Sequence, residues 1–234
     1  MVPVLLAVLA VSLPLALTSR GQAPFEASTP AVLHLPAAAH VAGAAGTDWR
    51  TDVELHNPAE QGTTTVTIDT LLHGQANTAP PSLTYDVVAS ESLRLDDILD
   101  SEFGLDGTAT LRLTATAEVV ASARTFNTTP DGTYGQLIAA VDDDDEIGPG
   151  EHGRLAGLHA QPSKKAGSRT NIGLVNATGA STEVRVKLNG SDGNSLGTVV
   201  EELAPYEYLQ INRVFERVTG AAVRNGWAAV WSPD

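Results

Sequence analysis

The chain has 234 residues, a formal net charge of −14 and no cysteine. The negative charge argues against nucleic acids and anionic membrane surfaces as partners, because both attract a footprint of lysine and arginine. The lack of cysteine excludes disulfides, thiolate metal sites and cysteine nucleophiles.

The N-terminus is an apolar run, Val2–Leu17, followed by small and polar residues. The run is short for a transmembrane helix, and two prolines weaken it further. We therefore expect residues 1–23 to be a secretory signal peptide, although no lysine or arginine precedes the apolar run. An uncleaved N-terminal anchor is the alternative. In either case the rest of the chain is expected to be exported, to the cell surface or the extracellular space.

An internal repeat organises the rest of the chain. The segment WRTDVELHN at Trp49–Asn57 returns as SRTNIGLVN at Ser168–Asn176, a shift of 119 residues (169 − 50). The repeat predicts two domains, residues 31–141 and 154–234. Residues 142–153 form the expected linker, because adjacent acids repel one another and Gly-Pro-Gly cannot build a regular element.

The first domain reads as short strands in which apolar and polar residues alternate. Pro36 predicts that the first of these strands lies at a sheet edge. Asp96 or Asp97 is expected to cap one short helix that ends at Gly104. The expected strands are 32–39, 51–56, 64–72, 82–88, 92–95, 107–114 and 118–127.

The second domain follows the same order, with expected strands at 155–160, 170–175, 182–188 and 197–203 and with Asn212 as the helix cap. Nothing in it corresponds to the closing strand 118–127. An unpaired strand edge invites pairing with another chain. We expect either that the sequence is a fragment of a longer protein, or that a partner or second copy supplies the strand.

These patterns predict an all-β fold made of two tandem immunoglobulin-like β-sandwich domains. Each domain is expected to contain one short helical turn, and the second is expected to lack its closing strand.

A set of motifs supports this fold by resemblance. The motifs are LPAAAHVAGAAGTDWRTDVELHNP, LRLDDIL, SARTFNTTPDGTYGQLIAAV, RTNIGLVN and LQINRVF. Together, from about Val32 to Trp231, they resemble an uncharacterised tandem β-sandwich module of secreted bacterial proteins. The resemblance implies export and an immunoglobulin-like sandwich, and it offers no catalytic residues to transfer.

No set of residues in the sequence converges on catalysis. The chain has no HExxH metal motif. Zinc held by His40, His56 and Asp52 is conceivable, but surface or capping roles are favoured for the histidines. Asp142–Glu146 could attract calcium, yet adjacent acids chelate poorly, so a linker is favoured. We expect no enzyme activity, no catalytic residue, no metal and no cofactor.

Trp49, Arg50 and Arg169 are the candidate contacts for a ligand or partner. A repeated arginine beside a repeated strand could clamp a carboxylate with two hydrogen bonds. The competing interpretation is that each arginine satisfies loop carbonyls or an acid within its own domain. Trp49 could stack on a sugar, since its ring is amphipathic.

The leading functional hypothesis is a non-catalytic exported module for adhesion, spacing or protein interaction, with a protein or glycan partner. The alternatives are a carbohydrate-binding module that uses Trp49 and the adjoining loop, or accessory domains of a secreted hydrolase. The fold class cannot choose among them, because sandwiches host many functions.

Overall fold

The computed structural model describes residues 5–7, 30–43, 46–129, 132–161 and 168–233, and it is all-β. Apart from Leu5–Ala7, the expected signal segment lies outside these residues. The chain divides into two compact units. The first unit takes the described residues of Leu9–Thr70 and Pro80–Asp144. The second takes those of Met1–Val8, Leu71–Ala79 and Asp145–Asp234.

Helices are few and short. In the described part of the chain they include the α-helix α1 (Ile98–Ser101) and the 3-10 turns η2 (Asp143–Asp145) and η3 (Val214–Arg217). None of the described helices has both the length and the apolar character needed to cross a bilayer.

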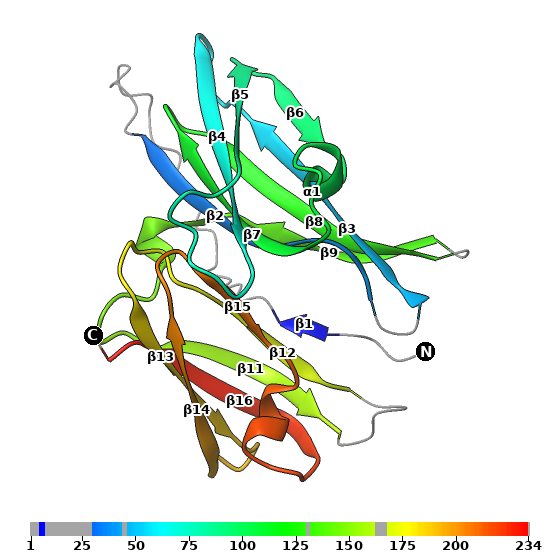
Figure 1. The fold of residues 1–234 in the computed structure, drawn as a ribbon, viewed down its shortest axis with the longest axis vertical. Helices are drawn as coiled ribbons and strands as arrows, with labels where there is room; N and C mark the ends of the chain where they lie inside the picture. Colours follow the sequence, from blue (N-terminus) through cyan, green and yellow to red (C-terminus); the bar gives the residue numbers. More distant parts are fainter. Residues whose placement is uncertain (1–4, 8–29, 44–45, 130–131, 162–167, 234) are drawn as a thin grey trace. The chain divides into compact units, whose positions relative to one another are not determined.

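The first unit is one folded-over sheet with the strand order β5-β4-β7-β2-β3-β8-β9 (Figure 1). Two short strands join it, because β10 pairs with β2 and β6 pairs with β3. The strands are β2 (Ala31–Ala42), β3 (Asp48–His56), β4 (Thr63–Leu72), β5 (Ser82–Val88), β6 (Ser92–Leu95), β7 (Gly107–Ala115), β8 (Val120–Thr129), β9 (Gly132–Ala139) and β10 (Val141–Asp142).

Strand β2 lies inside the sheet, so the expectation of an edge strand was wrong. It pairs with β7 along most of its length and with β3 at Val41 and Ala42. Pro36 is accommodated because the register with β7 shifts between Leu35 and Ala38. A proline lacks the N–H that a ladder needs, but an irregularity of this kind spares the sheet that bond.

The interior of the first unit is apolar and comes from alternate positions of its strands. This is the period-two pattern of the sequence, with one face turned inward. The fully buried side chains include Leu35, Val53, Leu55, Val66, Ile68, Leu111 and Leu113.

The second unit has a four-stranded sheet, β11-β16-β13-β14, and a three-stranded sheet, β1-β12-β15 (Figure 1). Side chains from both sheets and from η3 form a single buried cluster, which includes Ile172, Val186, Leu188 and Phe215. The strands are β1 (Leu5–Ala7), β11 (Gly153–Ala160), β12 (Thr170–Val175), β13 (Thr182–Asn189), β14 (Ser195–Leu203), β15 (Tyr208–Ile211) and β16 (Val223–Trp231). Two facing sheets around a common apolar core make a β-sandwich.

The second unit repeats the strand order β5-β4-β7-β2 of the first unit as β14-β13-β16-β11, and the pair β3–β6 as β12–β15. Strand β3 pairs with β6 so that Val53 faces Leu95, and β12 pairs with β15 so that Ile172 faces Ile211. The two registers are related by shifts of 119 (172 − 53) and 116 (211 − 95). In the described part of the second unit, no strand corresponds to β8.

Two segments depart from the expected boundaries. The acidic run begins inside the sheet, since Asp142 pairs with Leu33 and Asp143–Asp145 form η2. The end of β4 and the loop after it, Leu71–Ala79, group with the second unit. Within that unit, Gly74 N–H donates to the Tyr208 carbonyl (2.8 Å) and Asn77 N–H donates to the Pro205 carbonyl (2.9 Å).

Candidate functional site

The candidate site lies where strand β3 passes the short helix α1. A buried carboxylate on β3 fixes the start of this helix, because Asp52 Oδ1 accepts a hydrogen bond from Asp97 N–H (3.1 Å). The second unit repeats the arrangement, with Asn171 Oδ1 accepting from Arg213 N–H (3.0 Å). Asp97 and Arg213 both adopt left-handed backbone, with φ values of 49° and 52°. The repeated Asp/Asn position therefore serves the fold in both units.

Asp97 does not cap α1, contrary to expectation. It occupies the N-cap position, but its left-handed backbone leaves its side chain without a capping hydrogen bond. Asn212 does not cap η3 either, since the N-cap position there belongs to Arg213. The Asn212 Oδ1 atom instead accepts a hydrogen bond from Gln210 Nε2. In each unit the backbone N–H of the N-cap residue donates the hydrogen bond that anchors the turn.

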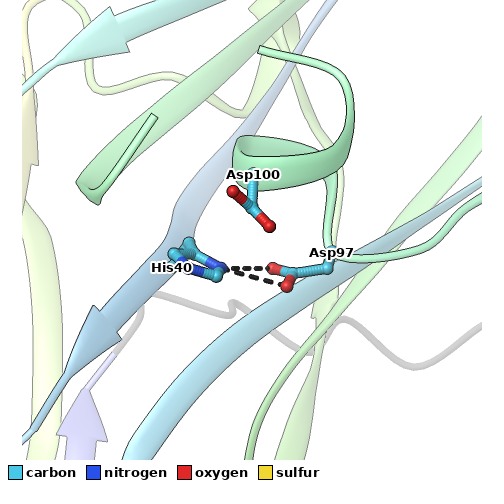
Figure 2. A group of neighbouring side chains, drawn as sticks. All are labelled: His40, Asp97 and Asp100. Atoms are coloured by element: carbon cyan, nitrogen blue, oxygen red, sulfur yellow. Dashed lines mark hydrogen bonds and ion pairs between the residues drawn. The ribbon is translucent and has the colours of Figure 1, made fainter. Parts of the chain in front are cut away.

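The Asp97 carboxylate makes no capping hydrogen bond and instead contacts two basic side chains, His40 and Arg50. His40 Nδ1 lies 3.0 Å from both of its oxygens, and Arg50 Nη1 donates to Oδ2 at 2.6 Å. Arg50 Nη2 also donates to Asp48 Oδ2 at 2.9 Å. Figure 2 shows His40 and Asp97 facing one another, with Asp100 above them on α1.

The electrostatics of the cluster favour the protonated histidine. The hydrogen bond to Asp97 raises the pKa of His40 above its ordinary value of 6.5, against the opposing effect of desolvation. The Asp48 hydrogen bond likewise raises the pKa of Arg50. The His40 and Asp97 side chains are only 21% and 16% exposed, so solvent screens their contact incompletely.

His40, Asp97 and Asp100 could in principle hold a metal ion, since one ligand atom from each lies within 4.8 Å of the others. The partners argue against that use. A metal would need both the neutral imidazole and an uncommitted carboxylate, whereas Asp97 already binds Arg50 and favours the imidazolium. The arrangement is best suited to an internal charge clamp that ties β2, β3 and α1 together.

The zinc set considered from the sequence does not assemble. His56 Nδ1 bonds to Ser92 Oγ (3.0 Å), away from the His40–Asp97 pair. Asp52 binds Arg94 Nη2 at 2.6 Å and the Asp97 amide. Each residue of the set has a separate structural partner.

The two repeated arginines, Arg50 and Arg169, have different surroundings. Arg50 meets acids within its own unit, which is the structural role weighed against ligand clamping. The acids that Arg50 meets are not repeated around Arg169, because Gly167 and Arg213 occupy the positions equivalent to Asp48 and Asp97. Its Nε atom is buried without a hydrogen-bond partner among the described residues.

Trp49 packs on the Gly/Ala loop that precedes it. A Cβ atom placed on Gly43 would collide with the Trp49 ring, so the glycine makes room for that ring. Trp49 therefore belongs to the packing at the start of β3, and its ring is half-buried there. Arg169 and Trp49 belong to different units.

Sequence reasoning missed the pairing of His40 with Asp97. One signal was available: Asp96-Asp97 lacks the Ser/Thr–Glu pattern of a capping box, so an aspartate there could have a partner other than the helix. The repeat gave a second signal, because the position of Asp97 is occupied by Arg213 in the second copy. Since arginine is not a capping residue, the two positions do not share a capping role.

No family model matches the chain, and no curated protein matches it. Among solved structures it is similar to "Thermotoga maritima 1070", at 13% sequence identity and a TM-score of 0.40. That likeness covers 50% of this chain and 97% of the other.

Proposed function

We propose that this chain is a non-catalytic, exported β-sandwich module that acts in adhesion, spacing or protein interaction outside the cell. On this proposal it is an immunoglobulin-like tandem module of a bacterial surface or secreted protein. Residues 1–23 act as its signal peptide.

One observation carries the proposal: the polar groups that could do chemistry hold the fold. Asp97 is shared between His40 and Arg50, and Asp52 is shared between Arg94 and a backbone amide. A general base or nucleophile needs an uncommitted side chain that can reach a substrate. Among the described residues, this cluster offers its groups to one another instead.

The test separates a structural cluster from a catalytic one. His40→Gln and Asp97→Asn are made in the full chain, and both thermal stability and hydrolysis of ester, peptide and glycoside substrates are measured. We expect both variants to unfold at lower temperature and no substrate to be turned over by any form. Reproducible hydrolysis that His40→Gln abolishes without lowering the unfolding temperature would overturn the proposal.

Export is tested separately. Full-length chain is expressed in a bacterial host, and the N-terminal residue of the protein outside the cytoplasm is determined by mass spectrometry. We expect a new N-terminus between about residues 19 and 24, at small residues that signal peptidases accept. Retention of the whole protein in the cytoplasm would contradict the proposed location.

A further inference from the structure

The repeated arginine has different surroundings in the two units. In the first unit, Arg50 donates hydrogen bonds to the carboxylates of Asp48 and Asp97. In the second unit, the Nε atom of Arg169 is buried without a hydrogen-bond partner among the described residues. A buried polar nitrogen of this kind is unfavourable until an acceptor binds the group. The surroundings of Arg50 show which acceptor would fit.

The backbone next to Arg169 is held as it is next to Arg50. Thr170 Oγ1 accepts a hydrogen bond from His159 N–H (3.1 Å) in the second unit. Thr51 Oγ1 accepts the equivalent bond from an amide of β2 (2.8 Å) in the first unit. Successive side chains of a strand point to opposite faces. Both arginine side chains therefore leave their strands at equivalent points, on the face opposite to the buried threonine.

The position of the acid is equally well defined. In the first unit, Arg50 Nη1 donates to Asp97 Oδ2 at 2.6 Å. Arg213 occupies the equivalent position, with the same left-handed backbone and the same amide hydrogen bond to the neighbouring strand. Its own Nη1 atom donates to Glu216 Oε1 (2.6 Å), so this cation has a partner on η3. The carboxylate that Asp97 supplies in the first unit is thus replaced by a second guanidinium.

The local sequence around Arg169 is basic, unlike the chain as a whole. Residues 152–182 contain no aspartate or glutamate and include four lysines and arginines, in a chain with a formal net charge of −14. The hydrogen bond at Thr170 places Ala160 where the first unit has His40, so a small side chain replaces an imidazole. A local excess of positive charge attracts an anion.

We propose that Arg169 anchors a carboxylate-binding site on the second unit, and that its ligand is an aspartate or glutamate side chain of a partner protein. The ligand carboxylate takes the place beside Arg169 that the Asp97 carboxylate takes beside Arg50. A guanidinium can bind a carboxylate with two parallel hydrogen bonds, which fix its orientation and strengthen the contact. This inference rests on the proposed interaction function and names the chemistry of the partner.

A protein carboxylate fits this position better than an acidic sugar. In the first unit the equivalent place is filled by an aspartate from a turn of the polypeptide. Aromatic rings provide the amphipathic surface on which a sugar stacks, but Ser168 stands where the first unit has Trp49. Two copies of this chain repel one another through their net negative charge, so a different protein is the expected partner.

The first test supplies the carboxylate from the chain itself. Arg213→Asp gives the second unit the acid that the first unit has, and Arg213→Asn is the matched neutral control. Asp97 shows that aspartate adopts the left-handed backbone required there. Both variants lose the ion pair with Glu216. We expect Arg213→Asp to unfold at a higher temperature than Arg213→Asn, and we expect this difference to vanish when Arg169→Gln is added to both.

The second test supplies the carboxylate from outside and uses the parent chain, so it is independent of how the Arg213 variants fold. The probe is the capped peptide Gly-Gly-Asp-Gly-Gly, and the control peptide has Asn in place of Asp. NMR follows the Arg169 Nε–H signal, assigned by its loss in Arg169→Gln, together with the Asn171 amide. We expect both signals to shift saturably with the aspartate peptide. The asparagine peptide should bind about tenfold more weakly, because a charged acceptor strengthens the hydrogen bonds.

Variants then locate the binding. Arg169→Gln should weaken binding of the aspartate peptide about tenfold, followed at the Asn171 amide. Arg213→Asp should weaken it similarly, because its own carboxylate occupies the site. Arg154→Gln, which removes an exposed arginine of the same unit, should bind as the parent does.

Three results would contradict the proposal. Equal unfolding temperatures of Arg213→Asp and Arg213→Asn, or an aspartate peptide that leaves the Arg169 signal unmoved, would overturn the site. Tighter binding of digalacturonate or inorganic phosphate than of the aspartate peptide would overturn a protein carboxylate as its ligand. The proposed function fails separately, if hydrolysis dependent on His40 is found.

Discussion

At the scale of single residues, the repeated asparagines do the same work in both units. Asn57 donates to the Val87 carbonyl and accepts from Ala59 N–H, and it is fully buried. Asn176 donates to the Ala204 carbonyl and accepts from Thr178 N–H. The asparagine that follows β3 or β12 therefore satisfies backbone groups that the turn would otherwise leave without a hydrogen bond.

Replacing Asn57 by alanine should leave the Val87 carbonyl and the Ala59 N–H without these hydrogen bonds. We expect Asn57→Ala to lower the free energy of unfolding by about 1–3 kcal/mol, the usual cost of a buried polar group left without a partner. Asn176→Ala should act similarly in the second unit. Chemical denaturation measures both, with the exposed Thr128→Ala as control. Unchanged stability in the asparagine variants would contradict the role assigned to them.

The His40–Asp97 contact should make stability depend on pH. Because Asp97 raises the pKa of His40 in the folded protein, the contact contributes fully below about pH 6.5 and is lost as pH rises through the raised pKa. Asp100 adds to this rise, and Arg50 opposes it. The difference in unfolding temperature between the parent and His40→Gln should therefore shrink with increasing pH.

NMR titration provides the direct measurement of this pKa. We expect the His40 ring signals, assigned by comparison with His40→Gln, to titrate above 6.5 in the parent. In Asp97→Asn the midpoint should fall, since the acceptor of the imidazolium is then neutral. If the His40 titration midpoint were the same in Asp97→Asn as in the parent, the contact would be absent in solution.

At the scale of elements, the short helix of each unit begins at a left-handed residue that is not glycine. Left-handed backbone costs an ordinary residue about 1–2 kcal/mol, so something must hold Asp97 and Arg213 there. Asp52 and Asn171 do this from the neighbouring strand by accepting the amide hydrogen bond. The strand thus decides where the helix starts.

Glycine at these two positions should have opposite effects. Arg213→Gly should raise the free energy of unfolding by about 1 kcal/mol, because glycine adopts left-handed backbone without strain. The ion pair it loses, with Glu216, is partly exposed and contributes little. Asp97→Gly should be destabilising, because His40 and Arg50 lose their common acceptor. Thermal unfolding compares the two, and Arg213→Ala isolates the loss of the ion pair.

At the scale of the whole molecule, the compact units are not two consecutive halves of the chain, because Leu71–Ala79 belong to the second unit. The loop that follows β4 in sequence contributes its hydrogen bonds to the second unit. Asn77 is buried there, where its side chain donates to the Leu72 and Tyr206 carbonyls and accepts from Leu72 N–H. A loop of this kind has buried polar backbone that must find partners, and the asparagine provides them.

Asn77→Ala should loosen this loop and the segment before β15. We expect faster hydrogen exchange of the Gly74 and Asn77 amides, which donate to Tyr208 and Pro205. Thr78→Ala, an exposed neighbour, is the matched control and should exchange as the parent does. Equal exchange in both variants would mean that the Asn77 side chain does not hold the loop.

The sequence by itself determined the strands and their repetition. The expected ranges for β5 and β6 are the observed Ser82–Val88 and Ser92–Leu95, because alternation and turn residues act locally. Matching residues at a fixed shift were enough to align β3 with β12.

Only the tertiary structure decided which side chains meet. Asp97 lies one residue from α1, yet its partners His40 and Arg50 come from strands 57 and 47 positions away. Pro36 lies in an interior strand because a register shift absorbs it, and the loop after β4 belongs to the second unit. Contacts between distant segments depend on strand register and chain packing, which local alternation and turn signals do not encode.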